Sequence, residues 1–519
     1  MCSSDLAHVT SGGAGGDGGL SDSGPGDGGR DAAGLDVGAL RRELAGAPDR
    51  SRLNPLGLGR VVTGAGAVDG LAGVTAGLAK TGGEVVVLAA ATPMSAGGRD
   101  LRAVVEQALG ASFTVRWVVV GPAAAAGGGL VHADEPTVAA AAAAAAGADC
   151  VVSVGSGTVT DIGKAAVPGG TPLVAVQTAT SVNGYADPFS VLLRRGVKRT
   201  TPSRWPDALV IDPGVLRDAP PDLNRAGAGD LMAMFTANAD WYLASAVPGP
   251  PLPPGADPGD GPAVHPGDPP YHPAVAGLVR ARGPRLLALA AGLGPDAAPG
   301  PLAELAGLLT LSGIAMGVAG STAPASGMEH AISHLLEMAA TARGEPASFH
   351  GTQVGVASIV AARTWAHVLR LVAGGGLDRA ARLPDPDAVR DRIGRAFAAI
   401  DPGGAMAAEC FADYARKLRR LGGGDPGDPL AGLRASWTAH RDVLDGLLLD
   451  PATVARALRS AGLPTRFCDL AEPVDDATAR WAVANCALQR QRFCVADLAM
   501  LLGAWDDGDV DEVLAGVIS

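Results

Sequence analysis

The alternation of short apolar runs with helical stretches, between about residue 58 and residue 211, limits the fold of this chain most. The runs are rich in β-branched residues and recur at 84–88, 115–120, 151–154, 173–176 and 208–211, after a shorter one at 61–62. Helical patterns separate several of them, at 71–80, 100–109 and 136–147. Continuous apolar runs of this length are typical of strands buried on both faces. We therefore expect a parallel sheet with helices on both faces.

After about residue 213 the strand signal ends and helical patterns follow. They cover 226–245, 302–320, 326–340, 351–372, 387–399, 405–420, 431–446, 451–461, 474–491 and 495–503. Strands and helices followed by helices alone predict two domains in a chain of this length. We expect an α/β fold with a Rossmann-like parallel-sheet domain at 51–212 and an all-helical domain at 213–519.

Two segments have compositions that do not suit a packed core. Residues 1–35 are rich in Gly, Asp and Ser, and we assign residues 1–50 to a disordered tail and a short lead-in. Residues 248–270 are rich in Pro and Gly, which predicts an exposed inserted loop in the helical domain.

Charge and cysteine content exclude several classes of protein. Lysine and arginine total 41 against 53 acidic residues, a net charge of −12, which argues against non-specific nucleic-acid binding. The six cysteines include no C-x-x-C pair, so neither a disulfide framework nor a cysteine-based zinc site is expected.

The sequence also favours a cytoplasmic protein without a membrane span. The N-terminus lacks the basic-then-apolar order of a signal peptide. Residues 305–328 carry no charge and are long enough to cross a bilayer. They contain many Gly, Ser and Thr residues and lead directly into Glu329 and His330, so a buried core helix or helix pair is expected. The oligomeric state is not given by the sequence, and a homodimer is the working assumption.

Residues 149–165 (DCVVSVGSGTVTDIGKA) contain a candidate phosphate-binding turn. A predicted buried strand ends in Gly155-Ser156-Gly157-Thr158, and a helix follows. Glycines let the backbone approach a phosphate, and the free N–H groups of a helix start attract the anion. The pattern is neither G-x-G-x-x-G nor a P-loop, so these residues alone leave an ordinary strand–helix turn as an equal alternative.

A hydroxyl-rich loop follows the next predicted strand and includes Thr178, Ser181 and Asn183. Open α/β sheets bind ligands at the carboxyl ends of their strands, which makes this loop a second candidate contact with a nucleotide. A loop whose side chains satisfy its own turns is equally compatible with the sequence.

The strand at 84–88 is followed by Ala89 and Ala90, where dinucleotide folds often have a carboxylate for the adenosine ribose. The choice between NAD and NADP therefore stays open, with Arg99 as a weak candidate for holding a 2′-phosphate.

A candidate metal site involves Asp230 and the histidines at 330, 334 and 350. His330 and His334 are four residues apart and share one helix face. Two imidazoles and a carboxylate bind zinc well and leave a fourth position open for substrate. The alternative is that Asp230, after a Gly-rich run, caps the start of an apolar helix while the histidines form hydrogen bonds within a core.

Several segments, in this order, carry a resemblance to a known family. They are EPT (135–137), GSGTVTDIGK (155–164), ATSVNGYADP (179–188) with GVK (196–198), AGAGDLMAMFTANADW (226–241), SGMEHAISHLLEM (326–338), HGTQVGVA (350–357), and RF (492–493) with DLA (497–499). Over about residues 55–510 the chain resembles glycerol-1-phosphate dehydrogenases. That group also contains iron-type alcohol dehydrogenases, glycerol dehydrogenase and dehydroquinate synthase.

The resemblance implies roles for the residues that match the family's motifs. Asp230, His330 and His350 match its three metal ligands, and His334 faces the active site beside them. The residues that match its cofactor site are Gly155, Ser156, Gly157 and Thr158 at the pyrophosphate, Asp161 in the same segment, and Thr178 and Ser181 near the nicotinamide. The family places the metal and the nicotinamide in a cleft between its two domains.

The activity implied is a metal-dependent, NAD(P)-linked interconversion of dihydroxyacetone phosphate and sn-glycerol 1-phosphate, or of a closely related ketone and alcohol. The cofactors implied are NAD or NADP and one divalent metal, with zinc expected first and iron or nickel as alternatives. The metal would act as a Lewis acid on the ketone of a small phosphorylated substrate.

Two positions concern the substrate. Asn183 stands where the family usually has Asp, near the substrate hydroxyls, and an amide cannot act as a carboxylate. Lys198, with Arg199, is our candidate for binding the substrate phosphate, although the residues alone slightly favour a solvated basic turn.

Two other functions remain open at this stage. A sugar-phosphate cyclase of the dehydroquinate synthase type shares the resemblance, but the scarcity of Lys and the HGTQVGVA segment favour simple reduction. A catalytically inactive paralogue that binds nucleotide is supported only by Asn183.

Overall fold

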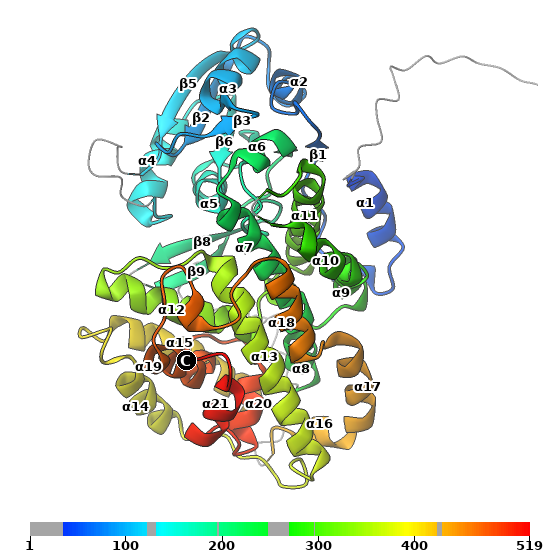
Figure 1. The fold of residues 1–519 in the computed structure, drawn as a ribbon, viewed down its shortest axis with the longest axis vertical. Coiled ribbons are helices and arrows are strands. Elements are labelled where there is room, and N and C mark those ends of the chain that lie inside the picture. The colour runs from blue at the N-terminus through cyan, green and yellow to red at the C-terminus, as the bar shows by residue number, and fades with distance from the viewer. Residues whose placement is uncertain (1–34, 122–130, 195–196, 248–268, 295, 423–427) are drawn as a thin grey trace, which may run out of the picture. The chain divides into compact units, whose positions relative to one another are not determined.

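Six parallel strands form the central sheet in the order β1–β10–β7–β6–β2–β5 (Figure 1). They are β1 (Arg60–Thr63), β2 (Glu84–Ala89), β5 (Thr114–Val119), β6 (Cys150–Gly155), β7 (Leu173–Gln177) and β10 (Ala208–Ile211). Every predicted strand lies within one residue of these bounds, so the expected parallel sheet is confirmed.

The computed structural model describes residues 35–121, 131–194, 197–247, 269–294, 296–422 and 428–519. These residues belong to one compact unit, Ala32–Ser519. A separation into domains at residue 212 therefore stays a prediction, although the strands among the described residues all lie between Arg60 and Ile211.

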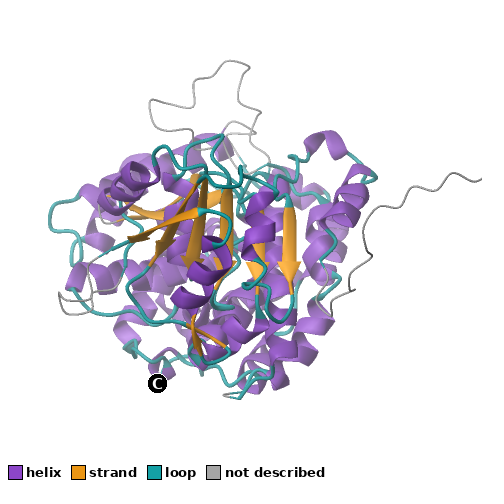
Figure 2. Ribbon diagram, turned by 90° about the horizontal axis from the view of Figure 1, so that it is seen from above, coloured by secondary structure: helices purple, strands orange, loops and turns teal. Residues whose placement is uncertain are grey.

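Helices cover both faces of the sheet, as expected (Figure 2). Alternate residues of β2 take part in two different hydrophobic clusters, because successive side chains of a strand point to opposite faces. Val85 and Val87 pack with α2 (Leu71–Ala76) and α3 (Leu101–Gly110). Val86 and Leu88 pack with α4 (Glu135–Ala145) and α5 (Gly157–Ala166).

Two short antiparallel hairpins were not predicted. One pairs β3 (Ser95–Ala96) with β4 (Arg99–Asp100), and the other pairs β8 (Phe189–Arg194) with β9 (Val197–Pro202). The second hairpin was missed because residues 198–201 of β9 are all polar, so this strand has no apolar run. Lys198 and Thr200, two residues apart, lie on one face of the strand. This polar face borders the cavity described below.

The described residues after β10 are helical or irregular, as expected. Their helices are α6 (Pro213–Asp218), α7 (Pro221–Met232), α8 (Ala237–Ala246), α9 (Pro273–Arg280), α10 (Gly283–Leu289), α11 (Pro299–Ala319), α12 (Met328–Arg343), α13 (His350–Ala373), α14 (Pro386–Phe397), α15 (Ala405–Gly422), α16 (Ala431–Ala435), α17 (Trp437–Leu447), α18 (Pro451–Ser460), α19 (Asp476–Asn485), α20 (Val495–Leu501) and α21 (Asp507–Leu514). The single helix expected at 226–245 is wrong. α7 ends at Met232, and a 3-10 turn (Ala233–Phe235) follows it. Thr236, with φ −125°, separates this turn from α8, and its hydroxyl donates to Glu329 at 2.7 Å.

The lead-in at the N-terminus contains a helix that was not predicted. α1 (Val37–Ala45) begins after Asp36, whose carboxylate accepts from the backbone N–H of Ala39. Its Val37, Leu40 and Leu44 belong to the large hydrophobic core. The expected tail up to residue 34 and residues 248–268 of the expected loop lie outside the described residues.

Two of the described helices, α11 and α13, are long and apolar enough to cross a membrane by length and composition. Of their most apolar windows, 83% and 67% are buried inside the molecule, which is how core helices of a folded protein behave. The segment expected to be a core helix or helix pair (305–328) coincides with α11 and the turn that follows it.

Candidate active site and metal centre

Asp230 and His350 lie on α7 and α13, two helices whose backbones touch through glycines. A Cβ atom on Gly229 would overlap the carbonyl oxygen of Gly351, and one on Gly351 would overlap that of Ala226. Only glycine permits this approach, and it brings the carboxylate-bearing turn of α7 against the first turn of α13. Asp230 lies in the last turn of α7, so the expectation that it begins or caps an apolar helix is wrong.

Asp230, His330 and His350 offer three ligand atoms that lie within 4.8 Å of one another. The Nε2 atom of His330 is 3.3 Å from Oδ1 of Asp230. Two ligands about 2.1 Å from a zinc ion at tetrahedral angles are about 3.4 Å apart, so this spacing suits one cation. Asp230 is 2% exposed and His330 6%, and their donor set of carboxylate and imidazole matches that of zinc enzymes.

Neighbouring groups orient both Asp230 and His330. The backbone N–H of Asn183 donates to Oδ2 of Asp230 at 3.2 Å, and Glu329 Oε1 lies 3.0 Å from Nδ1 of His330. Burial lowers the pKa of His330, but its hydrogen bonds with Asp230 and Glu329 outweigh this and raise the pKa to about 9. The ring is therefore held with Nε2 toward Asp230.

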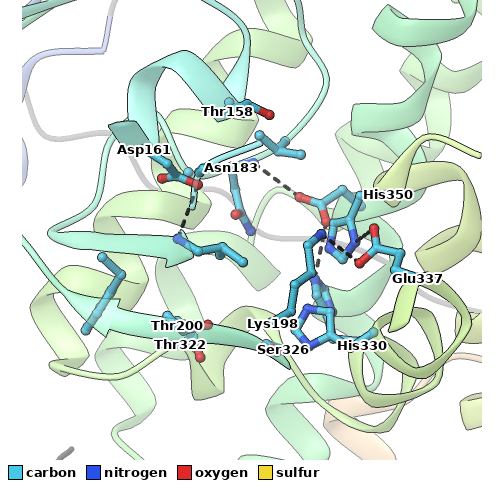
Figure 3. A pocket seen from close by; sticks show the side chains of 18 of the residues that line it. Thr158, Asp161, Asn183, Lys198, Thr200, Thr322, Ser326, His330, Glu337 and His350 are labelled. Atoms are coloured by element: carbon cyan, nitrogen blue, oxygen red, sulfur yellow. Dashed lines mark hydrogen bonds and ion pairs between the residues drawn. The ribbon is translucent and has the colours of Figure 1, made fainter. Parts of the chain in front are cut away.

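Glu337 is a site residue that the sequence analysis missed. Its Oε1 atom lies 3.1 Å from Nδ1 of His350, and its Oε2 atom accepts from Lys198 Nζ at 2.7 Å (Figure 3). Burial would raise the pKa of Glu337, but Lys198 and His350 hold it well below its usual range. Its position seven residues after His330 puts it on the same helix face, a spacing that could have revealed it.

His334 lies beside the three candidate ligands, as the resemblance implied. Its ring stacks on that of His350 with centroids 5.5 Å apart, and it lines the cavity. Burial and the neighbouring His350 keep the pKa of His334 well below its usual value, so this imidazole is neutral near pH 7. With Glu337 and His350 it forms a second group of three potential ligand atoms within 4.8 Å.

The predicted strand–turn–helix at 149–165 is confirmed. β6 ends at Gly155, Ser156 is extended, and α5 begins at Gly157. No side chain caps this helix start, so its first N–H groups remain available to an anion. A Cβ on Gly157 would come within 2.6 Å of the Val182 side chain, which explains the need for glycine. Gly157 and Thr158 line the cavity.

Asp161 also borders the cavity, but its carboxylate is already engaged. It lies 3.1 Å from Lys164 Nζ and accepts from the backbone N–H of Val191 at 3.2 Å. Lys164 is fully buried and donates to Asp187 at 3.0 Å and to the carbonyl oxygens of Gly184 and Phe189. Asp161 therefore helps to fix β8 and the loop at Gly184, both of which border the cavity.

The loop after β7 divides into buried and cavity-lining parts. Thr178 and Ser181 are 6% and 5% exposed and are not among the described residues that line the cavity. Asn183 does line it, and its side-chain amide donates to Ser312 Oγ at 3.2 Å. The expected roles of Thr178 and Ser181 thus stay predictions.

These elements surround one cavity of about 280 Å³ (Figure 3). The start of α5 borders it together with the candidate metal ligands. Its polar lining also includes Lys198 and Thr200 from β9, and Thr322 and Ser326 from the segment before α12. Thr200, Thr322 and Ser326 were not predicted. Arg492 braces that segment, since it donates to the Thr322 hydroxyl at 3.0 Å and to the Ser326 carbonyl.

Arg99, the weak candidate for a 2′-phosphate, forms a two-point ion pair with Asp69 on the surface. Both of its terminal nitrogens lie 2.9 Å from the carboxylate oxygens. This hydrogen-bonded pair lowers the pKa of Asp69. The contact gives Arg99 a partner in the protein, so a phosphate at this position would compete with Asp69.

The helix contact at Gly229 leads to a testable expectation. Gly229→Ala places a methyl group against the backbone of α13 and should destabilise the protein by about 1–3 kcal/mol, the usual cost of overpacking. Because the helices must separate, bound metal should be lost as well. Thermal unfolding and metal content measure the two effects.

Gly394→Ala is the matched control, because Gly394 lies on an exposed face of α14 with open space around its Cβ position. It should leave stability unchanged or raise it by up to about 1 kcal/mol. Equal stabilities of the two variants would contradict the proposed role of the glycine contact.

Comparison with known proteins identifies relatives of the chain. A family model described as iron-containing alcohol dehydrogenase matches residues 104–220. The chain is 32% identical over 220 residues to a glycerol-1-phosphate dehydrogenase [NAD(P)+] of Bacillus velezensis, covering 42% of this chain and 50% of that protein. It is 29% identical over 303 residues to one of Aeropyrum pernix, covering 58% and 76%. The chain spans about half the length of most of the curated relatives that it matches.

The fold is shared with solved structures of low sequence identity. A probable glycerol dehydrogenase from Sinorhizobium meliloti 1021 superimposes with a TM-score of 0.51 at 18% identity, covering 89% of this chain and 98% of that one. This similarity confirms the arrangement of a parallel-sheet part followed by a helical part. By its family match and its sequence relatives, the chain is similar to iron-containing alcohol dehydrogenases and to glycerol-1-phosphate dehydrogenases.

Proposed function

We propose that this protein is a metal-dependent, NAD(P)-linked dehydrogenase that interconverts dihydroxyacetone phosphate and sn-glycerol 1-phosphate. The observation that carries the proposal is one cavity in which an uncapped helix start, suited to a phosphate, lies with a carboxylate and two imidazoles, suited to a metal. Relatives named for this activity support it. We further propose a cytoplasmic location and a homodimer.

The start of α5 is the proposed pyrophosphate site. The N–H groups of Gly157 and Thr158 have no side-chain cap, and the helix dipole favours negative charge at this end. The buried Lys164 holds the neighbouring loop through hydrogen bonds to Gly184 and Asp187, two residues that line the cavity.

Asp230, His330 and His350 are the proposed ligands of one divalent cation. When bound, the cation would supply Lewis acidity to the substrate carbonyl, and NAD(P)H would supply the hydride. The chain contributes orientation: the Asn183 N–H fixes one carboxylate oxygen of Asp230, and Glu329 fixes the ring of His330. Asp230 and His330 are largely buried, and a surrounding of low dielectric constant strengthens their electrostatic effect.

Other polar groups that line the cavity suit a small phosphorylated ketone. Hydroxyls of Thr200, Thr322 and Ser326 line it, and the Asn183 amide can both donate to and accept from a substrate hydroxyl. Because an amide does not take up a proton at neutral pH, Asn183 binds substrate in this scheme and does not act as a base.

The deciding experiment combines metal analysis of the purified protein with oxidation of NADH and NADPH across phosphorylated and free ketones. We expect one divalent metal per chain, net NAD(P)H consumption with dihydroxyacetone phosphate, and loss of turnover on chelation that added Zn²⁺ restores. Full activity after exhaustive chelation would contradict the metal assignment. Phosphate release without net cofactor consumption would instead indicate a cyclase, and no turnover of any ketone would indicate an inactive paralogue.

A further inference from the structure

Each of the two proposed histidine ligands, His330 and His350, has a glutamate at its Nδ1 atom. Glu329 lies 3.0 Å from Nδ1 of His330, and Glu337 lies 3.1 Å from Nδ1 of His350. Both glutamates belong to α12, eight residues apart. An imidazole has two ring nitrogens, so a carboxylate on Nδ1 leaves Nε2 for the metal and fixes the ring orientation.

The two glutamates differ in the partner of their second carboxylate oxygen. Oε2 of Glu329 accepts from the buried hydroxyl of Thr236 at 2.7 Å. Oε2 of Glu337 accepts from the ammonium of Lys198 at 2.7 Å, which reaches it from β9. The side chain of Lys198 is 31% exposed and that of Glu337 10%, so this ion pair lies at the wall of the cavity.

Glu337 also has the geometry to bind a metal itself. It forms, with His334 and His350, a second group whose ligand atoms lie within 4.8 Å of one another. The two groups share His350, so a cation has two candidate positions, which differ in the carboxylate and in the second histidine that bind it. The ammonium of Lys198 opposes a cation at the second position, because it already occupies the Glu337 carboxylate with a positive charge.

We propose that Lys198 and Glu337 are a positioning pair: Lys198 withholds Glu337 from the metal, and Glu337 in turn orients His350 so that the cation binds at Asp230. The inference rests on the proposed function, since it requires a bound metal. It gives Lys198 a role different from the substrate-phosphate contact expected from the sequence. The β8–β9 hairpin thereby takes part in metal binding through a residue that is not a ligand.

The test measures metal affinity and the ligand environment in Glu337→Gln, Lys198→Met and Lys198→Arg. Zn²⁺ affinity is measured by competition with a chelator, and the visible spectrum of Co²⁺-loaded protein reports the ligand set. Glu337→Gln keeps the side-chain size and should weaken Zn²⁺ binding by about 10- to 100-fold, as loss of an outer carboxylate usually does. Lys198→Met should change the Co²⁺ spectrum, because Glu337 is then released toward the metal, whereas Lys198→Arg should retain the original spectrum.

A double variant and a surface control complete the design. Because Lys198 acts through Glu337, the double variant Lys198→Met/Glu337→Gln should bind Zn²⁺ no more weakly than Glu337→Gln alone. Glu345→Gln, on an exposed glutamate just beyond α12, should change neither affinity nor spectrum.

The outcomes distinguish a failure of the positioning pair from a failure of the proposed function. Wild-type protein that binds no metal overturns the proposed function. Wild-type protein that binds metal, with unchanged affinity and spectrum in Glu337→Gln and Lys198→Met, overturns the positioning pair alone. A Lys198→Met variant with only a raised KM for the phosphorylated ketone also overturns it and assigns Lys198 to the substrate phosphate.

Discussion

Asp230→Ala is expected to remove bound metal and to lower turnover by about 1,000-fold or more, while the protein remains folded. Lewis-acid stabilisation by a metal is worth several kcal/mol, and each 1.36 kcal/mol corresponds to a factor of ten in rate. The truncation deletes the only carboxylate of the proposed ligand set and leaves two imidazoles, too few to hold a divalent cation tightly. Metal content, kcat and a thermal unfolding curve measure the three parts of the prediction.

Asp222→Ala is the matched control for this variant. Asp222 lies on the same helix, α7, with a side chain that is 71% exposed and paired with Arg225. Because exposed ion pairs contribute little, its loss should leave metal content and turnover unchanged. An Asp230→Ala protein that keeps stoichiometric metal and wild-type turnover would remove Asp230 from the proposed site.

Lys164→Met should destabilise the protein by about 3–5 kcal/mol, the usual cost of removing one partner of a buried ion pair. Lys164 is fully buried between Asp161 and Asp187 and also donates to the carbonyl oxygens of Gly184 and Phe189. Methionine fills a similar volume but supplies no charge, so two carboxylates are left close together inside the protein. The midpoint of urea unfolding measures the loss.

Lys80→Met tests whether this loss depends on burial. Lys80 is exposed after α2, and its replacement should change stability by no more than about 0.5 kcal/mol. If Lys164→Met were as stable as Lys80→Met, the buried cluster could not be what orders the loop at Gly184.

The parallel sheet could be predicted because its strands are visible in the sequence as short apolar runs. Val85 to Leu88 are buried on both faces, and a strand of this kind has a continuous apolar run that few other structures share. The turn between Gly155 and Gly157 could be predicted equally well, because a strand pattern, two glycines and a helix pattern follow one another directly.

The parts that could not be predicted depend on contacts between distant segments. From the sequence alone, Lys198 is expected in a solvated basic turn. In the structure, β9 places it against Glu337, which lies 139 residues further along the chain. The Gly-rich run before Asp230 resembles a helix start, and only contacts with distant segments show why glycines are needed there. Gly227 lies against the carbonyl oxygen of Thr180, and Gly229 lies against α13. The residues around a glycine inside a helix do not show whether the glycine makes the chain flexible or lets another backbone pack closely against it.

The contact between α7 and α13 restricts how this sequence can change over time. At Gly229 and Gly351 the obstructing atoms are carbonyl oxygens of the opposite backbone, so a larger residue at either position cannot be accommodated by a smaller one elsewhere. Only movement of the helices apart would make room, and that movement separates Asp230 from His350. The distance between these two side chains is therefore set by how closely the two backbones pack, and substitutions can adjust the candidate metal site only from the other segments that border the cavity, which include α12 and β9.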